Sequence, residues 1–196
     1  MLDGLIGTIL SQHTSDLNSE RALQSLKARF TCWADVRDAP LEQVIEAIRC
    51  GGLAEVKAPR IQQVLTIVLE QGWLDHLDEM PLAEAKQRLT SLPGVGPKTA
   101  ACVLLFSCGR PALPVDTHVY RVASRLGLIS PNTSAEAAHD QLERQLAPDE
   151  VYSFHVNMIR LGREICHARN PECERCPLAD VCVYYRNQRR SVSTHG

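Results

Sequence analysis

Three absences narrow the possibilities for this 196-residue sequence. No apolar run is long enough to span a bilayer, and the first residues, MLDGLIGTILSQ, lack the basic segment and cleavage site of a secretory signal. The formal net charge of −2 excludes a uniformly basic nucleic-acid binder, although it allows a local basic face. No stretch of β-branched residues alternates strictly with polar ones, as it would in half-buried strands. We therefore expect an intracellular, cytoplasmic protein with no membrane partner and no β-sheet.

Apolar residues recur instead at helical spacing along most of the chain. Stripes of this kind cover residues 2–10, 17–30, 41–48, 61–68 and 82–89, and further helices are expected over 97–107, 117–126, 134–146 and 149–165. Glycines and prolines, such as Gly51-Gly52 and Pro93-Gly94, separate these segments. The pattern predicts an all-α fold with short connections.

The eight cysteines need an explanation other than disulfides in a reducing compartment. Four of them form a C-x6-C-x2-C-x5-C loop, a spacing that indicates a metal site: Cys166, Cys173, Cys176 and Cys182. Zinc and an iron–sulfur cluster both accept four thiolates, and a single loop that surrounds its metal group favours the cluster. The other four are expected to be small apolar core residues: Cys32, Cys50, Cys102 and Cys108.

The stretch SLPGVGPKTA, residues 91–100, places a glycine hairpin directly before Lys98. A nucleotide-binding P-loop is excluded, because no strand precedes it and the spacing is wrong. Glycines let the backbone approach a ligand, and the free N–H groups of a helix that begins at Pro97 would suit one DNA phosphate. The helix dipole disfavours a cation in the first turn of a helix, and burial in a dry cleft would disfavour the charged form further. Lys98 is therefore either a nucleophilic amine or a second phosphate-binding cation.

The stretch LPVDTHVYR, residues 113–121, predicts a helix start with Asp116 as its N-cap. A capping carboxylate can also stabilise a positive charge that develops nearby. Capping and catalysis are therefore compatible at this residue.

Taken together, these motifs resemble the endonuclease III family of the helix-hairpin-helix DNA glycosylase superfamily. The matching stretches are ILSQHTSD, LPGVGPKTA, VDTHVYRV, LGREIC and the cysteine loop, and they run from residue 9 to 182. The resemblance implies a hairpin-bearing helical domain at 1–110 and a helical domain at 111–196 that holds a [4Fe–4S] cluster on the four loop cysteines, with the DNA cleft between them. It also implies that Lys98 is the nucleophile and Asp116 the catalytic carboxylate.

The implied activity is that of a bifunctional DNA glycosylase and AP lyase, which removes oxidised pyrimidines and cuts the strand 3′ to the lesion by β-elimination. Its partner would be duplex DNA with damaged bases or abasic sites, bound by a monomer. The alternatives are a superfamily glycosylase for another base and a non-catalytic damage-binding protein, against which the intact Lys98 and Asp116 argue.

The resemblance also implies a set of DNA contacts. His13 aligns with the family's glutamine that fills the gap left by the flipped base, and Leu53 lies in the loop that carries its wedge residue. The chain begins at what resembles the family's second helix, so we expect apolar surface on the cluster domain to be uncovered or covered otherwise. The expected DNA-binding residues are Gln12, His13, Leu53, Gly94, Val95, Gly96, His118, Arg169 and Arg175.

Overall fold

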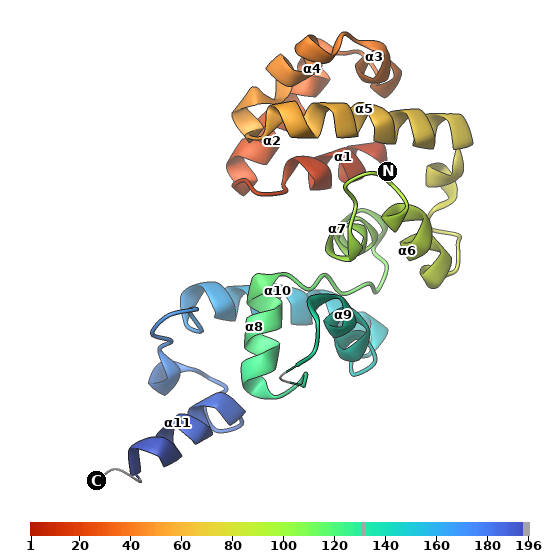
Figure 1. Ribbon diagram of the computed structural model, residues 1–196. Coiled ribbons are helices and arrows are strands. Elements are labelled where there is room, and N and C mark those ends of the chain that lie inside the picture. Colours follow the sequence, from red (N-terminus) through yellow and green to blue (C-terminus); the bar gives the residue numbers. More distant parts are fainter. Residues whose placement is uncertain (131, 194–196) are drawn as a thin grey trace. The chain divides into compact units, whose positions relative to one another are not determined.

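The computed structural model describes residues 1–130 and 132–193, and within these ranges it contains helices and no strand (Figure 1). The expectation of an all-α fold is confirmed. The chain divides into two compact units, Met1–Arg110 and Pro111–Gly196, named here the hairpin unit and the cysteine unit. In the described ranges, no helix is both long enough and apolar enough to pass through a membrane.

The hairpin unit contains seven α-helices and three shorter helical turns among its described elements. The α-helices are α1 (Leu2–Leu10), α2 (Asp16–Arg29), α3 (Trp33–Asp38), α4 (Leu41–Ile48), α5 (Ala54–Gln71), α6 (Leu82–Thr90) and α7 (Pro97–Cys102). Two 3₁₀ turns cover Arg49–Gly51 and Trp73–His76, and a π-helical turn, Val103–Ser107, extends α7.

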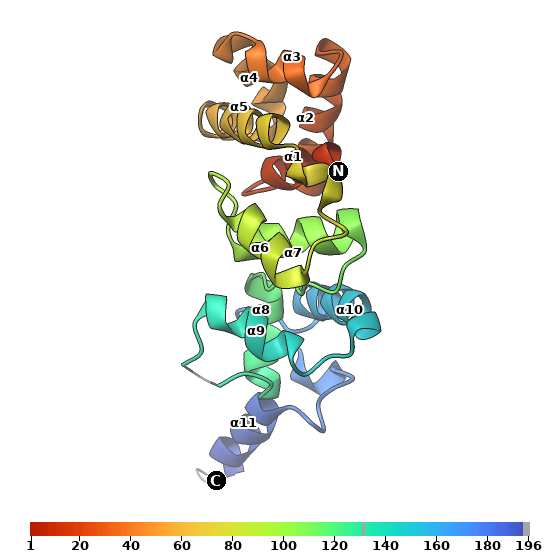
Figure 2. The ribbon, with the colours of Figure 1, turned by 90° about the vertical axis from the view of Figure 1, so that its right-hand side faces the viewer.

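The longest of these helices, α5, forms the centre of the hairpin unit. It lies between α1 on one side and α3 and α4 on the other (Figure 1, Figure 2). Ile61 and Leu65 of α5 are fully buried, as are Leu5, Ile6 and Leu10 of α1. Each such side chain contributes roughly 1.5–3 kcal/mol by leaving water, so the predicted apolar stripe of residues 2–10 is a true core face.

The predicted stripe of α2 is wrong at its first position. Leu17 is 61% exposed, because α2 begins at Asp16 with Ser15 as its N-cap, and Leu17 lies on the solvent side of the first turn. The buried face of α2 comprises Ser19, Ala22 and Leu26. Small residues on this face allow close packing against α1 and α4.

The core role expected for the four other cysteines holds for one of them. Cys102 is buried in α7 and Cys108 is partly buried, but Cys32 and Cys50 are exposed. Cys32 is the N-cap of α3, and Cys50 lies in the 3₁₀ turn before α5. Both therefore occupy connections rather than the apolar faces of helices.

The cysteine unit is built around a close pair of helices, α8 (Thr117–Leu126) and α10 (Val151–Glu164). A Cβ added at Gly162 of α10 would lie 2.9 Å from the Cβ of His118 on α8, so glycine is what permits this approach. The remaining elements are α9 (Ala135–Glu143), two 3₁₀ turns, Pro148–Glu150 and Cys173–Arg175, and α11 (Val183–Ser193) (Figure 2).

Candidate functional site

The hairpin is a tight turn in which the two glycines have different tasks. Gly94 has a φ of +74°, in the left-handed region that favours glycine. The N–H of buried Val95 donates to the Leu92 carbonyl at 3.1 Å, which closes the turn. Gly96 is the extended N-cap of α7, and an added Cβ would meet nothing within 4 Å. The backbone at Gly96 is therefore open to an approaching ligand.

Gln12 connects the end of α1 to this hairpin through two hydrogen bonds. Its Nε2 atom donates to the Gly94 carbonyl at 3.0 Å and to the Thr99 hydroxyl at 3.1 Å. The amide of this predicted DNA-binding residue is thus engaged inside the hairpin unit. Its neighbour His13 is exposed and has no such contact among the described residues.

Lys98 is the second residue of α7, directly after the hairpin. The expectation of burial is wrong for the protein alone, because the Lys98 side chain is exposed. In the described part of the chain it has neither a hydrogen-bond partner nor an ion-pair partner. A cation at this position also faces the positive end of the helix dipole. The amine is therefore free to meet a ligand.

Two loops of the hairpin unit present exposed residues in a strained backbone conformation. His13, after α1, has a φ of 54°, and Leu53, before α5, has a φ of 52°. The left-handed region costs a non-glycine residue of the order of 1 kcal/mol and is uncommon. Leu53 is nevertheless 51% exposed, so the strain does not serve burial of its side chain in the core. Both residues were predicted DNA contacts.

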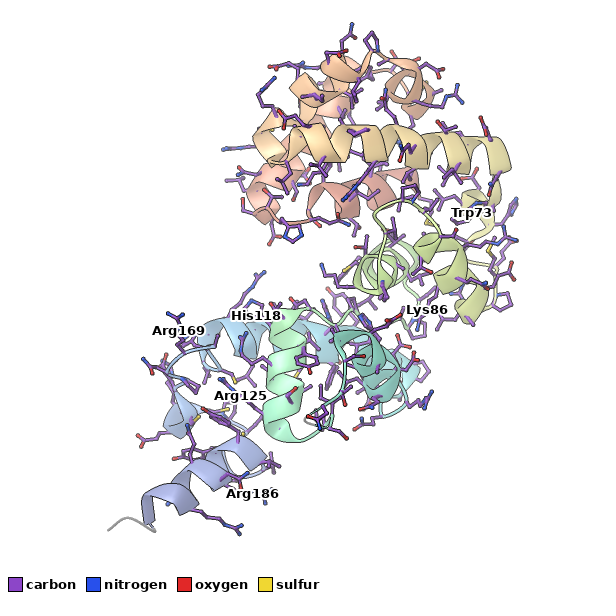
Figure 3. The ribbon with its side chains drawn as sticks, in the orientation of Figure 1. Trp73, Lys86, His118, Arg125, Arg169 and Arg186 are labelled. Atoms are coloured by element: carbon purple, nitrogen blue, oxygen red, sulfur yellow. The ribbon has the colours of Figure 1, made fainter. Side chains whose placement is uncertain are left out.

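Asp116 caps α8, as the sequence predicted. Its Oδ1 atom accepts a hydrogen bond from the Val119 N–H at 2.8 Å, and the residue is partly buried. His118 follows within the first turn of α8, and its Nδ1 atom lies 3.0 Å from Nη2 of Arg121. Figure 3 shows His118 close to the end of α8 at which Asp116 is the cap. Lys98 and Asp116 belong to different units, the hairpin unit and the cysteine unit respectively.

The four loop cysteines together line one pocket of the cysteine unit. Among the described residues, no three His, Cys, Asp or Glu side chains converge as they would on one metal ion. The four sulfurs are therefore not arranged around one metal ion but line a pocket. The pKa of the Cys173 thiol is raised, first by burial and then by the other three thiols. A space enclosed by four cysteines suits a [4Fe–4S] cluster, which accepts four thiolates.

Arg121 and Arg125 of α8 hold this loop, and neither was predicted as a site residue. Nη1 of Arg125 donates to the Cys166 sulfur at 3.2 Å and to the His167 carbonyl at 2.7 Å, and its guanidinium lies 4.6 Å from the Tyr184 ring centre. Arg121 donates to the Cys166 carbonyl at 3.0 Å. Figure 3 shows Arg125 pointing from α8 toward the cysteine loop. The helix capped by Asp116 is therefore also the helix that orients the metal site.

The two loop arginines that were predicted to contact phosphates differ in their surroundings. Arg169 is exposed, and within the described ranges it has no hydrogen-bond or ion-pair partner (Figure 3). Arg175 donates to Glu172 at 2.8 Å, and this contact is the main reason why the pKa of the Glu172 carboxyl lies below its usual value. Arg169 therefore presents a free charge, whereas the charge of Arg175 is partly offset.

Comparison with known proteins agrees with this arrangement. Residues 6–148 match the HhH-GPD superfamily of base excision DNA repair proteins, and residues 166–182 match the iron–sulfur binding domain of endonuclease III. A protein of Arabidopsis thaliana named as a candidate DNA glycosylase is 41% identical over 162 residues, which cover 81% of this chain and 55% of that relative. This chain thus spans about half the length of that relative.

Endonuclease III of Thermotoga maritima is 35% identical over 185 residues, covering 94% of this chain and 83% of that protein. Among solved structures, a non-covalent endonuclease III–DNA complex has a TM-score of 0.79 at 32% identity and covers 95% of this chain and 84% of that one. A trapped endonuclease III–DNA covalent intermediate has a TM-score of 0.80 at 31% identity, with the same coverage. This chain is therefore a DNA repair enzyme of the HhH-GPD superfamily, with the [4Fe–4S] cluster of the endonuclease III iron–sulfur binding domain as its cofactor.

Proposed function

We propose that this enzyme is a bifunctional DNA glycosylase and AP lyase that removes oxidised pyrimidines from duplex DNA. The observation that carries the proposal is Lys98, an exposed amine with no partner among the described residues, placed directly after the glycine hairpin. A lysine that only contacts a phosphate could lie at many places on the DNA-binding surface. A nucleophile, in contrast, must be held at one place beside the DNA backbone. The solved endonuclease III–DNA covalent intermediate shows that a related enzyme bonds covalently to DNA, which supports a search for a nucleophile in this chain.

The reaction begins when the Lys98 nitrogen bonds to C1′ of the flipped nucleotide as the bond from C1′ to the base breaks. The base leaves with the electron pair of that bond and takes up a proton, while the lysine nitrogen loses one. Opening of the sugar ring then gives an imine between Lys98 and C1′. Loss of the C2′ proton breaks the C3′–O bond and releases a 5′-phosphate, so the strand is cut 3′ to the lesion. Water finally hydrolyses the imine and restores the amine.

Asp116 is assigned the stabilisation of positive charge on the sugar as the base leaves. Its Oδ1 atom is fixed by the Val119 N–H, whereas its Oδ2 atom has no hydrogen-bond partner among the described residues. A carboxylate held in this way needs little reorganisation during the reaction. The cluster supplies structural support to the loop that carries Arg169, and Arg121 and Arg125 bind that loop from α8.

In this proposal the enzyme contacts the phosphate backbone of the DNA and disrupts one base pair. The backbone at Gly94, Val95 and Gly96 binds a phosphate, which positions the duplex without reading its sequence. Arg169 and Arg175, and His118 near the start of α8, add further contacts. His13 and Leu53 enter the base stack where the target nucleotide leaves it.

The experiment uses the cluster-bearing enzyme and duplexes with thymine glycol, uracil or an abasic site, with and without borohydride. Borohydride reduces the imine to a stable amine, so wild-type enzyme becomes covalently attached to DNA through Lys98. Lys98→Gln should lose trapping and strand cleavage while it keeps much of its binding. Asp116→Asn keeps an N-cap, since asparagine caps as well, but it should slow base release by roughly 10²–10³-fold.

The outcomes separate the proposal from its rivals. Excision of uracil but not thymine glycol would indicate a related glycosylase for another base. Binding without any excision or cleavage would indicate a damage-binding protein. If Lys98→Gln cuts abasic DNA at the wild-type rate, Lys98 is a phosphate contact and the assignment of the nucleophile is wrong.

A further inference from the structure

Lys57 is a buried lysine that the chemistry described above does not use. It lies in the first turn of α5, and 2% of the residue is exposed. Burial lowers the pKa of its ammonium group, because desolvation disfavours the charged form. In the described part of the chain no carboxylate pairs with it. Burial of an ammonium group costs folding free energy unless hydrogen bonds within the protein replace those that it made to water.

Those hydrogen bonds go to two backbone carbonyls that are far apart in the sequence. The Nζ atom of Lys57 donates to the Leu10 carbonyl at 2.7 Å and to the Gly51 carbonyl at 3.1 Å. Leu10 is the last residue of α1, and Gly51 is the last residue of the 3₁₀ turn before α5. Carbonyls at helix C-termini lack intrahelical partners and carry partial negative charge, so a cation suits both.

Each of these carbonyls lies just before one of the two exposed residues of the hairpin unit that have a positive φ. His13 follows Leu10 by three positions, and Leu53 follows Gly51 by two. The backbone N–H of Lys57 also donates to the Leu53 carbonyl at 2.9 Å. Lys57 therefore holds the Leu53 loop through its side chain and its main chain, and the His13 loop through its side chain.

The same contacts continue into the hairpin. Gln12, two residues after Leu10, donates to the Gly94 carbonyl and to the Thr99 hydroxyl. A continuous set of hydrogen bonds within the hairpin unit thus runs from the hairpin through the end of α1 to Lys57 and the Leu53 loop. The lysine is the member of this set that contacts both loops.

We propose that Lys57 is a positioning residue that fixes the separation of His13 and Leu53, so that both side chains enter one disrupted base pair of the DNA. This inference rests on the proposed function, in which these two residues enter the base stack. Without the ammonium group the two loops are joined through packing alone, and their tips can move relative to one another. Loss of Lys57 should therefore impair opening of the base pair more than binding to the DNA backbone.

The test replaces Lys57 with methionine, which has a similar length and no donor. Two quantities are measured on the cluster-bearing enzyme: the ratio of affinities for lesion and undamaged duplex, and the fluorescence of 2-aminopurine placed opposite the lesion, which rises when that base unstacks. The matched control is Val68→Ala, which removes buried volume from α5 eleven residues further on. Circular dichroism identifies a temperature at which all variants are folded.

We expect Lys57→Met to lose at least tenfold in the affinity ratio and most of the fluorescence rise, while its affinity for undamaged duplex changes little. Val68→Ala should keep both signals, and Lys57→Arg should recover part of them, because a guanidinium can also donate to two carbonyls. If Lys57→Met does not fold, Lys57→Gln, whose shorter amide reaches at most one of the carbonyls, should give an intermediate loss. An unchanged ratio in whichever of these two variants folds, or an equal loss in Val68→Ala, overturns the proposal. Failure of the wild-type enzyme to excise any lesion would instead overturn the proposed function.

Discussion

Replacement of Gly162 by alanine sets two opposing effects against each other in the cysteine unit. Alanine in a helix is favoured over glycine by at most about 1 kcal/mol. The new Cβ, however, would lie 2.9 Å from the His118 Cβ, 3.0 Å from its Nδ1 and 3.2 Å from Nη2 of Arg121. The His118 Cβ is fixed to α8 and cannot turn away, so the two helices must separate. Overpacking of this kind costs roughly 1–3 kcal/mol. We therefore expect a net destabilisation of about 1 kcal/mol.

Urea unfolding can assign this loss to one unit, because the two units carry different reporters. Both tryptophans, Trp33 and Trp73, lie in the hairpin unit, whereas the visible absorption of the cluster reports on the cysteine unit. With a slope of about 1–3 kcal/mol per molar urea, cluster bleaching should shift to lower urea by roughly 0.3–1 M. The control is Gly7→Ala in α1, where the new Cβ makes an ordinary 3.4 Å contact with Leu23. A Gly162→Ala protein with unchanged cluster bleaching would refute the reasoning.

Three further predictions follow from the metal site, the hairpin and one ion pair. Wild-type protein should be brown, with about four irons per chain, and Cys173→Ser should lose the colour and unfold the cysteine unit; a colourless protein with stoichiometric zinc would contradict this. Gly96→Ala should fold normally, because the added Cβ meets open space, yet weaken binding to damaged and undamaged duplex alike; a loss specific to one lesion would show that the hairpin does more than bind phosphate. Hydrogen bonds from Lys27 and Trp33 lower the pKa of Asp3, so this carboxylate adds a little stability above pH 4 that is lost as the pH falls. In an acid titration, the Asp3→Asn protein should therefore lose less stability than the wild type in that pH range.

Most of the helices were predictable from the sequence because their buried faces repeat every three or four residues. Two of them were not predicted. In α3, six residues long, only Val36 is buried, so no periodic pattern can form. In α11 the apolar residues Val183, Tyr184 and Tyr185 are adjacent and precede a run of polar and charged residues. Its order depends on contacts with α8, including the stacking of Tyr184 on Arg125.

The chemical groups of the candidate site were predictable for a different reason: each belongs to a short motif. A glycine turn, a helix cap and a cysteine loop are local structures, so the spacing of a few residues specifies them. The exposure of Lys98 and the pairing of Arg175 with Glu172 depend on the surroundings, and neither could be predicted from a local motif.

The residues that hold these motifs in place were missed because their contacts are long-range and end on the backbone. Arg125 reaches carbonyls more than forty residues away, and Lys57 reaches the Leu10 carbonyl across forty-seven positions. Every residue has a carbonyl, so such a contact leaves no partner of recognisable type in the sequence. What the sequence does contain is a basic residue that helical periodicity places near an apolar face. Lys57 lies four residues before Ile61 of the central helix, and that position identifies it as a candidate for a buried ammonium that must find acceptors.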